Sequence, residues 1–333
     1  MTSVLFVRLS AMGDLVQGLG AVQALHVARP DWRLSVVTQA PWAPLLEELP
    51  GVVRVVTFAR RGGLAAVLRL RRELRADRYD VALDLQGNWK SAFVAWLSGA
   101  AQRIGCAARQ EPASRWLLHR LVPSASRHPA LVATALGREL VPGLPFRLPV
   151  LQPRAAEIER ERAALRELGV APEQPFRVLV VTDPRDPRAL RPDVVAAEAA
   201  ASAEPVVWLL GPAEAGLRDP EGARVLRHGP GEVRRLVALG HLVAQAGGIV
   251  LGPDQGGSHV LAAAGARCIV SFGAQDPERT APPTATIVRH AAPPACSPCR
   301  RRTCDHPAGP VCMGFTHDTG HQFGRLVDRR QSL

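Results

Sequence analysis

Short runs of apolar residues alternate along the chain with longer segments in which apolar residues recur every three or four positions. Such runs are typical of buried strands, and the longer spacing is typical of amphipathic helices. In the first half the pattern predicts strands at Val4–Leu9, Leu34–Thr38, Val52–Phe58 and Val81–Leu85. It predicts helices at Leu15–Ala28, Trp42–Leu49, Leu64–Leu74 and Lys90–Leu97.

The same alternation restarts after Pro172. Strands are predicted at Arg177–Thr182, Val206–Leu210, Arg224–Arg227, Ile249–Leu251, Arg267–Phe272 and Thr286–His290. Helices are predicted at Val194–Ala203, Val233–Ala246, Val260–Ala264 and Thr319–Arg330. Strands that alternate with helices favour an α/β fold, here two Rossmann-like, doubly wound domains that face a cleft.

The predicted domain organisation follows from these two series. Residues 1–152 form the first domain and residues 173–315 the second, joined by a linker at 153–172 that contains the charged helix Ala155–Leu168. Residues 316–333 hold the terminal helix. Residues 183–192 and 273–280 are expected to be loops. The stretch 103–149 is less regular, and part of it is either a mobile loop that faces an acidic substrate or a solvated basic surface. Its basic residues are Arg109, Arg115, His119, Arg120, Arg127 and His128.

A polar segment with two adjacent glycines follows the predicted strand Ile249–Leu251. Asp254, Gly256, Gly257, Ser258 and His259 belong to it. Such loops lie at the carboxyl ends of parallel strands, where α/β proteins bind ligands, and a helix start offers unpaired N–H groups to an anion. A phosphate or nucleotide site and a plain tight turn, with Ser258 as helix cap, are both compatible with this segment.

A second candidate site follows the first strand. Arg8, Ser10, Gly13 and Asp14 occupy the turn between that strand and the first helix. This position places the Asp14 carboxylate at the carboxyl edge of the sheet, although an aspartate in a first helical turn also simply balances the helix dipole. Neither G-x-G-x-x-G nor G-x-x-x-x-G-K-[ST] occurs here, so the turn is not one of those phosphate-binding motifs.

The net charge of the chain favours some classes of binding partner over others. The 41 basic residues exceed the 30 acidic ones, which gives a net charge of +11, and Lys90 is the one lysine. This excess suits a phosphate-bearing partner such as a nucleotide, a nucleic acid or an anionic membrane surface. Aromatic residues make up 5% of the chain, which disfavours single-stranded nucleic acid as the partner. With no apolar run of membrane-spanning length and no signal-peptide pattern, we expect a cytoplasmic protein.

Four cysteines lie close together near the C-terminus: Cys296, Cys299, Cys304 and Cys312. In a cytosolic protein such spacing indicates metal or redox chemistry more often than disulfides. A structural zinc held by the four thiolates is one interpretation, and four reduced thiols in a loop is the other.

Four motifs in order carry a resemblance to a known family. They are Arg8…Asp14, Asp84-Leu-Gln-Gly-Asn-Trp-Lys-Ser91, Asp254-Gln-Gly-Gly-Ser-His259 and Phe272-Gly-Ala-Gln-Asp-Pro277. Each alone is weak, but together the constellation resembles the family 9 glycosyltransferases, the ADP-heptose:lipopolysaccharide heptosyltransferases. The resemblance implies the GT-B architecture, with an acceptor domain at 1–152, a nucleotide-sugar domain at 173–315 and a terminal segment that packs back on the first domain.

The resemblance also implies an activity and roles for residues. The reaction is expected to be an inverting transfer of heptose from ADP-heptose to a lipid-linked, lipopolysaccharide inner-core acceptor, with Asp14 as general base and no metal required. Asp254, Gly256, Gly257, Ser258, His259, Arg188 and Arg191 are expected to bind the donor. Arg8, Ser10, Gly13, Gln86 and Lys90 are expected to bind the acceptor. A lipid-linked acceptor would bring the basic first half transiently to the anionic inner face of the inner membrane.

The chain departs from the family pattern in the half that is expected to bind the donor. Where relatives carry a glycine-rich turn and K-x-W-P, residues 182–192 contain no glycine, lysine or tryptophan. Arg188 or Arg191 replaces the lysine, although guanidinium and ammonium groups are not interchangeable at a tight phosphate site. Asp183 and Asp186 would repel a diphosphate. A donor-altered or non-catalytic relative that binds a nucleotide sugar or a partner protein therefore stays open. An oxidoreductase has only the fold in its favour, and a nucleic-acid binder only the charge.

Overall fold

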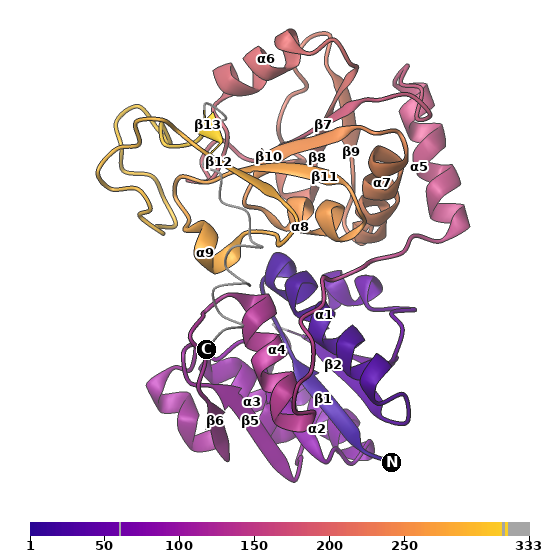
Figure 1. Cartoon of the computed structure of the whole chain (residues 1–333), viewed down its shortest axis with the longest axis vertical. Helices are drawn as coiled ribbons and strands as arrows, with labels where there is room; N and C mark the ends of the chain where they lie inside the picture. The colour runs from indigo at the N-terminus through magenta and orange to yellow at the C-terminus, as the bar shows by residue number, and fades with distance from the viewer. Residues whose placement is uncertain (60, 315–316, 319–333) are drawn as a thin grey trace. The chain divides into compact units, whose positions relative to one another are not determined.

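The computed structural model describes residues 1–59, 61–314 and 317–318 of the 333-residue chain (Figure 1). Two compact units are present, Met1–Pro149 and Val150–Leu333. Each unit is built around one sheet with helices in the connections between strands. The predicted terminal helix at Thr319–Arg330 lies outside the described residues.

The first unit contains a six-stranded parallel sheet in the order β3-β2-β1-β4-β5-β6. Its strands are β1 (Ser3–Val7), β2 (Arg33–Gln39), β3 (Val52–Phe58), β4 (Val81–Asp84), β5 (Gln102–Cys106) and β6 (Arg120–Val122). All five residues of β1 are buried, because strands flank it on both sides and helices cover both faces, which explains its uninterrupted apolar sequence.

Helices connect these strands and complete the core of the first unit. They are α1 (Met12–Ala28), α2 (Gly63–Ala76), α3 (Trp89–Leu97) and α4 (Pro129–Leu140), with the 3₁₀ turns η1 (Ala40–Leu45) and η2 (Pro112–Leu117). Helix α1 is buried along most of its length and packs against α4. A side chain at Gly20 would overlap with the carbonyl group of Arg147, so a glycine is needed where residues 147–149 cross this helix.

The second unit repeats the arrangement in the order β13-β12-β11-β10-β7-β8-β9, in which only the short β13 is antiparallel among the described strands. The strands are β7 (Arg177–Val181), β8 (Val206–Leu210), β9 (Arg224–Arg227), β10 (Ile249–Pro253), β11 (Arg267–Ser271), β12 (Thr286–Arg289) and β13 (His317–Asp318). The helices are α5 (Ala155–Glu167), α6 (Pro192–Ala201), α7 (Val233–Gln245), α8 (Gly256–Ala263) and α9 (Pro277–Thr280), with the 3₁₀ turn η3 (Pro212–Glu214).

Helix α5 packs on α7 within the second unit, and its Glu161 is fully buried. The two Glu161 oxygens bind His228 Nε2 at 2.8 Å and Arg235 Nε at 2.6 Å. A buried carboxylate is tolerated there because both of its oxygens are hydrogen-bonded to basic groups. Among the described residues, no helix combines the length and apolar character that crossing a bilayer requires.

The structure differs from the predicted elements in three places. Residues 103–149 contain β5, η2, β6 and α4, which form because β5 pairs with β4 and β6 although its own sequence is interrupted by polar residues. Residues 273–280 end in the short helix α9, whose start Asp276 caps by accepting a hydrogen bond from the Glu278 amide at 3.1 Å. Helix α8 begins at Gly256 and not at Val260, so the two glycines are its first residues.

Candidate functional site

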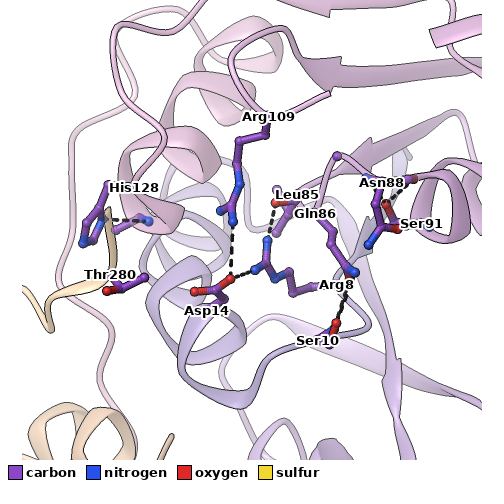
Figure 2. A network of polar contacts seen from close by, with 12 residues as sticks. Arg8, Ser10, Asp14, Leu85, Gln86, Asn88, Ser91, Arg109, His128 and Thr280 are labelled. Atoms are coloured by element: carbon purple, nitrogen blue, oxygen red, sulfur yellow. Dashed lines mark hydrogen bonds and ion pairs between the residues drawn. The ribbon is translucent and has the colours of Figure 1, made fainter. Parts of the chain in front are cut away.

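Asp14 lies in the first turn of α1, at the carboxyl edge of the first sheet, with two arginines against it (Figure 2). Arg8 Nη2 and Arg109 Nη2 both bind Asp14 Oδ2, the latter at 3.3 Å. The Asp14 side chain is 19% exposed. Its other oxygen, Oδ1, makes no hydrogen bond with any residue that the structure describes, and is therefore the oxygen available to a bound molecule.

The Arg8 side chain is buried in the first unit and held there by hydrogen bonds. It is only 2% exposed, and Nη1 donates to the Leu85 carbonyl at 2.6 Å. Burial, with the charge of Arg109, holds the pKa of Arg8 well below its usual value, while the charge of Asp84 opposes this shift. The Arg8 guanidinium is thus held by Leu85 and Asp14 and positions the Asp14 carboxylate, while its predicted contact with the acceptor stays a prediction.

Gln86 joins the loops that follow two neighbouring strands. Its Oε1 accepts hydrogen bonds from the Leu9 amide at 2.8 Å and the Ser10 amide at 3.0 Å, and its Nε2 donates to Ser10 Oγ at 3.1 Å. The pairing of β1 with β4 places these loops side by side. The amide side chain therefore fixes the turn that leads into Asp14.

The rest of the Asp84–Ser91 motif shapes the loop after β4. Buried Asp84 accepts hydrogen bonds from the Gln86 and Gly87 amides, each at 3.0 Å, and burial raises its pKa although these bonds oppose the shift. Gly87 has φ +82°, and a side chain there would come within 2.8 Å of the Arg109 backbone. Asn88 and Ser91 cap α3 reciprocally, through the Ser91 amide to Asn88 Oδ1 at 3.0 Å and the Asn88 amide to Ser91 Oγ at 3.1 Å.

The structure therefore brings most of the predicted acceptor residues together. Arg8, Ser10, Gly13 and Gln86 surround the turn that carries Asp14, whereas Lys90 lies exposed in the first turn of α3. Arg109 was not among the predicted site residues. It was one of several arginines in the stretch 103–149, and only the sheet order, which places β5 beside β4, distinguishes it from the others.

In the second unit, Asp254 directly follows β10 and is buried, with both carboxylate oxygens hydrogen-bonded. Oδ1 binds His259 Nε2 at 2.9 Å, and Oδ2 accepts from Thr280 Oγ1 at 2.8 Å. Ser258 is also buried, and its hydroxyl donates to the Pro253 carbonyl at 2.8 Å. Asp254, Ser258 and His259 thus form the frame of the loop, while the half-buried Gly256 and Gly257 present the start of α8.

The two arginines that were predicted to bind the donor diphosphate are paired with aspartates. Arg188 binds both oxygens of Asp186, with Nη2 to Oδ2 at 2.7 Å, and Nη1 donates to the Asp254 carbonyl at 3.3 Å. Burial lowers the pKa of Arg188, but Asp186 outweighs it and raises that pKa overall. Arg191 binds Asp193, with Nη2 to Oδ2 at 2.6 Å. Only Arg188 is thus shown in contact with the Asp254 loop.

The four clustered cysteines all have free thiols. Cys296 is exposed, Cys299 and Cys304 are half-buried, and Cys312 is buried in a small apolar cluster beside β10. Burial and the neighbouring thiols raise the pKa of Cys312 to about 11. In the described part of the chain, no group of three or more His, Cys, Asp or Glu side chains is arranged to hold a metal ion. The zinc hypothesis therefore receives no support from this geometry and stays a prediction.

Two Rossmann-like units in one chain, together with the likeness to solved heptosyltransferase structures, confirm the predicted α/β fold of GT-B type. The predicted cleft between the two domains stays a prediction. The sequence profile "Glycosyltransferase family 9 (heptosyltransferase)" matches residues 67–181 and 199–308. These matches cover more than half of the chain, so the protein belongs to glycosyltransferase family 9.

Individual relatives are distant. Lipooligosaccharide heptosyltransferase 2 of Haemophilus ducreyi is 28% identical over 181 residues, 51% of each chain. The chain spans about half the length of the curated relatives it matches. Among solved structures, a family 9 glycosyltransferase of Veillonella parvula has a TM-score of 0.74 at 15% identity, covering 86% of this chain and 85% of its own. E. coli heptosyltransferase WaaC with ADP-2-deoxy-2-fluoro heptose has a TM-score of 0.66 at 19% identity, covering 86% and 93%.

Proposed function

We propose that this family 9 member transfers heptose, or a related sugar, from ADP-heptose to a lipid-linked, lipopolysaccharide inner-core acceptor at the cytoplasmic face of the membrane. The observation that carries the proposal is the Asp14 carboxylate, which two arginines fix through Oδ2 while Oδ1 stays available. The donor and acceptor classes rest on likeness to heptosyltransferases such as that of H. ducreyi.

Asp14 acts as the general base in this proposal. Oδ1 takes the proton of the acceptor hydroxyl as its oxygen attacks the anomeric carbon, the bond from that carbon to the diphosphate oxygen breaks, and ADP leaves. Attack from the face opposite the leaving group inverts the anomeric configuration. Arg8 and Arg109 keep the carboxylate oriented through their contacts with Oδ2.

The leaving diphosphate requires positive charge and N–H donors. The first turn of α8, with the Gly256 and Gly257 amides, supplies donors together with the positive end of the helix dipole. Arg188 stands beside this turn through its contact with the Asp254 carbonyl. In this proposal these groups neutralise the negative charge of the leaving diphosphate, so that no divalent metal is required.

The test is transfer by the full chain from ADP-heptose to a deacylated, water-soluble inner-core acceptor, followed as ADP release and by NMR of the product anomer. Asp14→Asn is expected to lower kcat roughly 10²- to 10⁴-fold, the usual contribution of a general base. The matched control is Asp31→Asn, which removes an exposed carboxylate that pairs only with exposed Arg29 among the described ion pairs. Turnover within a few fold of wild type in Asp14→Asn would exclude this role.

A donor-altered or non-catalytic relative is the second candidate, and one observation favours it. Arg185, Arg188 and Arg191 are each paired with an aspartate two residues away, so their charges are already balanced. Calorimetric titration with ADP, and with UDP as control, separates the candidates. Selective ADP binding supports the heptosyltransferase, whereas an absence of binding to either nucleotide supports the second candidate.

A further inference from the structure

Three neighbouring elements of the first unit present large apolar side chains to solvent. Helix α2 packs beside α3 (Figure 1), and the turn η2 also packs against α3. The exposed residues are Leu64 (73%), Leu68 (55%), Trp89 (49%), Trp96 (43%) and Trp116 (88%). These five residues and the arginines of the same three elements are called the α2–α3–η2 face below.

The apolar residues are arranged by helix period. Trp89, Phe93 and Trp96 follow one another at spacings of four and three along α3, so they line one side of that helix. The Phe93 ring stacks on Trp96 with centroids 5.7 Å apart, and Phe93 in turn packs on the core. Leu64 and Leu68 are four residues apart and so lie on one side of α2. The tryptophans and leucines are exposed because the opposite sides of α2 and α3 supply the residues that pack in the core.

Two hydrogen bonds fix the three elements relative to one another. Arg75 Nε of α2 donates to the Leu97 carbonyl of α3 at 3.4 Å. The amide of Trp89, at the start of α3, donates to Glu111 Oε2 at 2.9 Å, immediately before η2. The face is thus a preformed surface on secondary structure.

Its charge is strongly positive. Exposed basic residues from these elements and their flanks are Arg61, Arg69, Arg71, Arg72, Arg75 and Arg115, with Lys90 beside Trp89. The same segments and flanks hold three acidic residues, Glu73, Asp77 and Glu111. Asp77 is paired with Arg54, and Glu111 accepts from the Trp89 amide. Next to Trp116, a hollow of about 670 Å³ is lined by Arg115, His119 and Arg120 together with apolar residues.

We propose that the α2–α3–η2 face docks on an anionic phospholipid bilayer. Tryptophan and leucine side chains suit the boundary between head groups and acyl chains, and arginines suit the lipid phosphates. A second copy of the chain fits poorly, since a symmetric contact would place these arginines against each other. The inference rests on the proposed function in one respect, that the acceptor reaches the enzyme on a membrane.

Vesicle flotation of the full chain tests the docking. Binding is expected to vesicles of phosphatidylcholine with phosphatidylglycerol, to fall as salt rises, and to be absent with phosphatidylcholine alone. Each basic residue near an anionic surface strengthens binding about fivefold, so Arg72→Glu with Arg115→Glu is expected to weaken it at least about 25-fold. Arg33→Glu, at an exposed arginine of β2, is the matched control and is expected to have a much smaller effect.

A second pair of variants tests the apolar part. Trp96→Ser with Trp116→Ser is expected to lose vesicle binding, and Val27→Ser, at a 59% exposed apolar residue of α1, is expected to keep it. Brominated acyl chains are expected to quench the tryptophan fluorescence of the wild type, and less that of Trp96→Phe with Trp116→Phe, which keeps apolar surface but removes two fluorophores.

The outcomes separate this proposal from the proposed function. Face variants should transfer sugar to the deacylated acceptor as the wild type does, with unchanged thermal unfolding, while losing vesicle binding. Equal binding to neutral vesicles, or variants that bind like the wild type, would overturn the docking proposal even if transfer occurs. Self-association in sedimentation that the tryptophan variants abolish, without vesicle binding, would assign the face to a second copy instead.

Discussion

Gly87 lies against the backbone of Arg109, whose side chain binds the candidate catalytic residue Asp14. Its φ of +82° is a left-handed conformation that residues other than glycine adopt at a cost of about 1–2 kcal/mol. A Cβ atom there would lie 2.8 Å from the Arg109 carbonyl carbon and oxygen and 2.9 Å from its Cβ, all closer than packed atoms allow. Gly87→Ala must therefore displace the backbone that carries Arg109.

The expected loss of stability has two parts. The left-handed conformation contributes about 1–2 kcal/mol, and overpacking against a rigid neighbour contributes about 1–3 kcal/mol more. Gly143 separates the two parts, because it has φ +76° in the same unit but no atom within 4 Å of the position that a Cβ would take, so Gly143→Ala carries only the first. Gly87→Ala is thus expected to unfold at a lower denaturant concentration than Gly143→Ala.

Activity should respond more steeply than stability. Arg109 Nη2 lies 3.3 Å from Asp14 Oδ2, so a displacement on the order of 1 Å would break that contact, and misplacement of this size can cost about 10²-fold in rate. The assay is kcat on the deacylated acceptor under conditions where both variants remain folded. If Gly87→Ala matched Gly143→Ala in both kcat and unfolding free energy, the close approach of Gly87 to Arg109 would contribute to neither stability nor activity, and the reasoning would be refuted.

Three further predictions concern buried ionisable groups. Glu161→Gln is expected to lower the unfolding free energy by about 3–5 kcal/mol, because it leaves basic partners without their buried counter-charge; chemical denaturation measures this. Burial raises the pKa of Asp84 in the folded state. The contribution of Asp84 to stability is therefore complete below its ordinary pKa of 3.8 and is lost as the pH rises through the folded-state pKa. Unfolding free energies measured against pH should lose this dependence in Asp84→Asn. Iodoacetamide is expected to label exposed Cys296 before Cys312, whose pKa is raised to about 11, whereas protection of all four clustered thiols with one bound zinc per chain would support the metal hypothesis instead.

The regular elements were largely predictable because they depend on local spacing. The strands at Val52–Phe58, Val206–Leu210 and Arg224–Arg227 were predicted with their observed bounds. The stretch 103–149 was not, because β5 and the three-residue β6 are strands through their pairing with neighbours and not through their own apolar content. Helix α4 did carry a local signal in Pro129 at its first position, after His128 whose Nδ1 accepts from the Ala130 amide at 3.3 Å.

The sequence by itself determined that two α/β units follow one another and that Asp14 and the Asp254 loop each follow a strand. It determined this because hydrophobic period and turn residues act over a few positions, and parallel strands place their following loops at one edge. Only the tertiary structure decided that Arg109, 95 residues from Asp14, binds the same oxygen as Arg8, and that three neighbouring elements expose their tryptophans and leucines together. Both depend on which strands and helices lie next to each other, and that order is set by long-range pairing and packing across the whole unit.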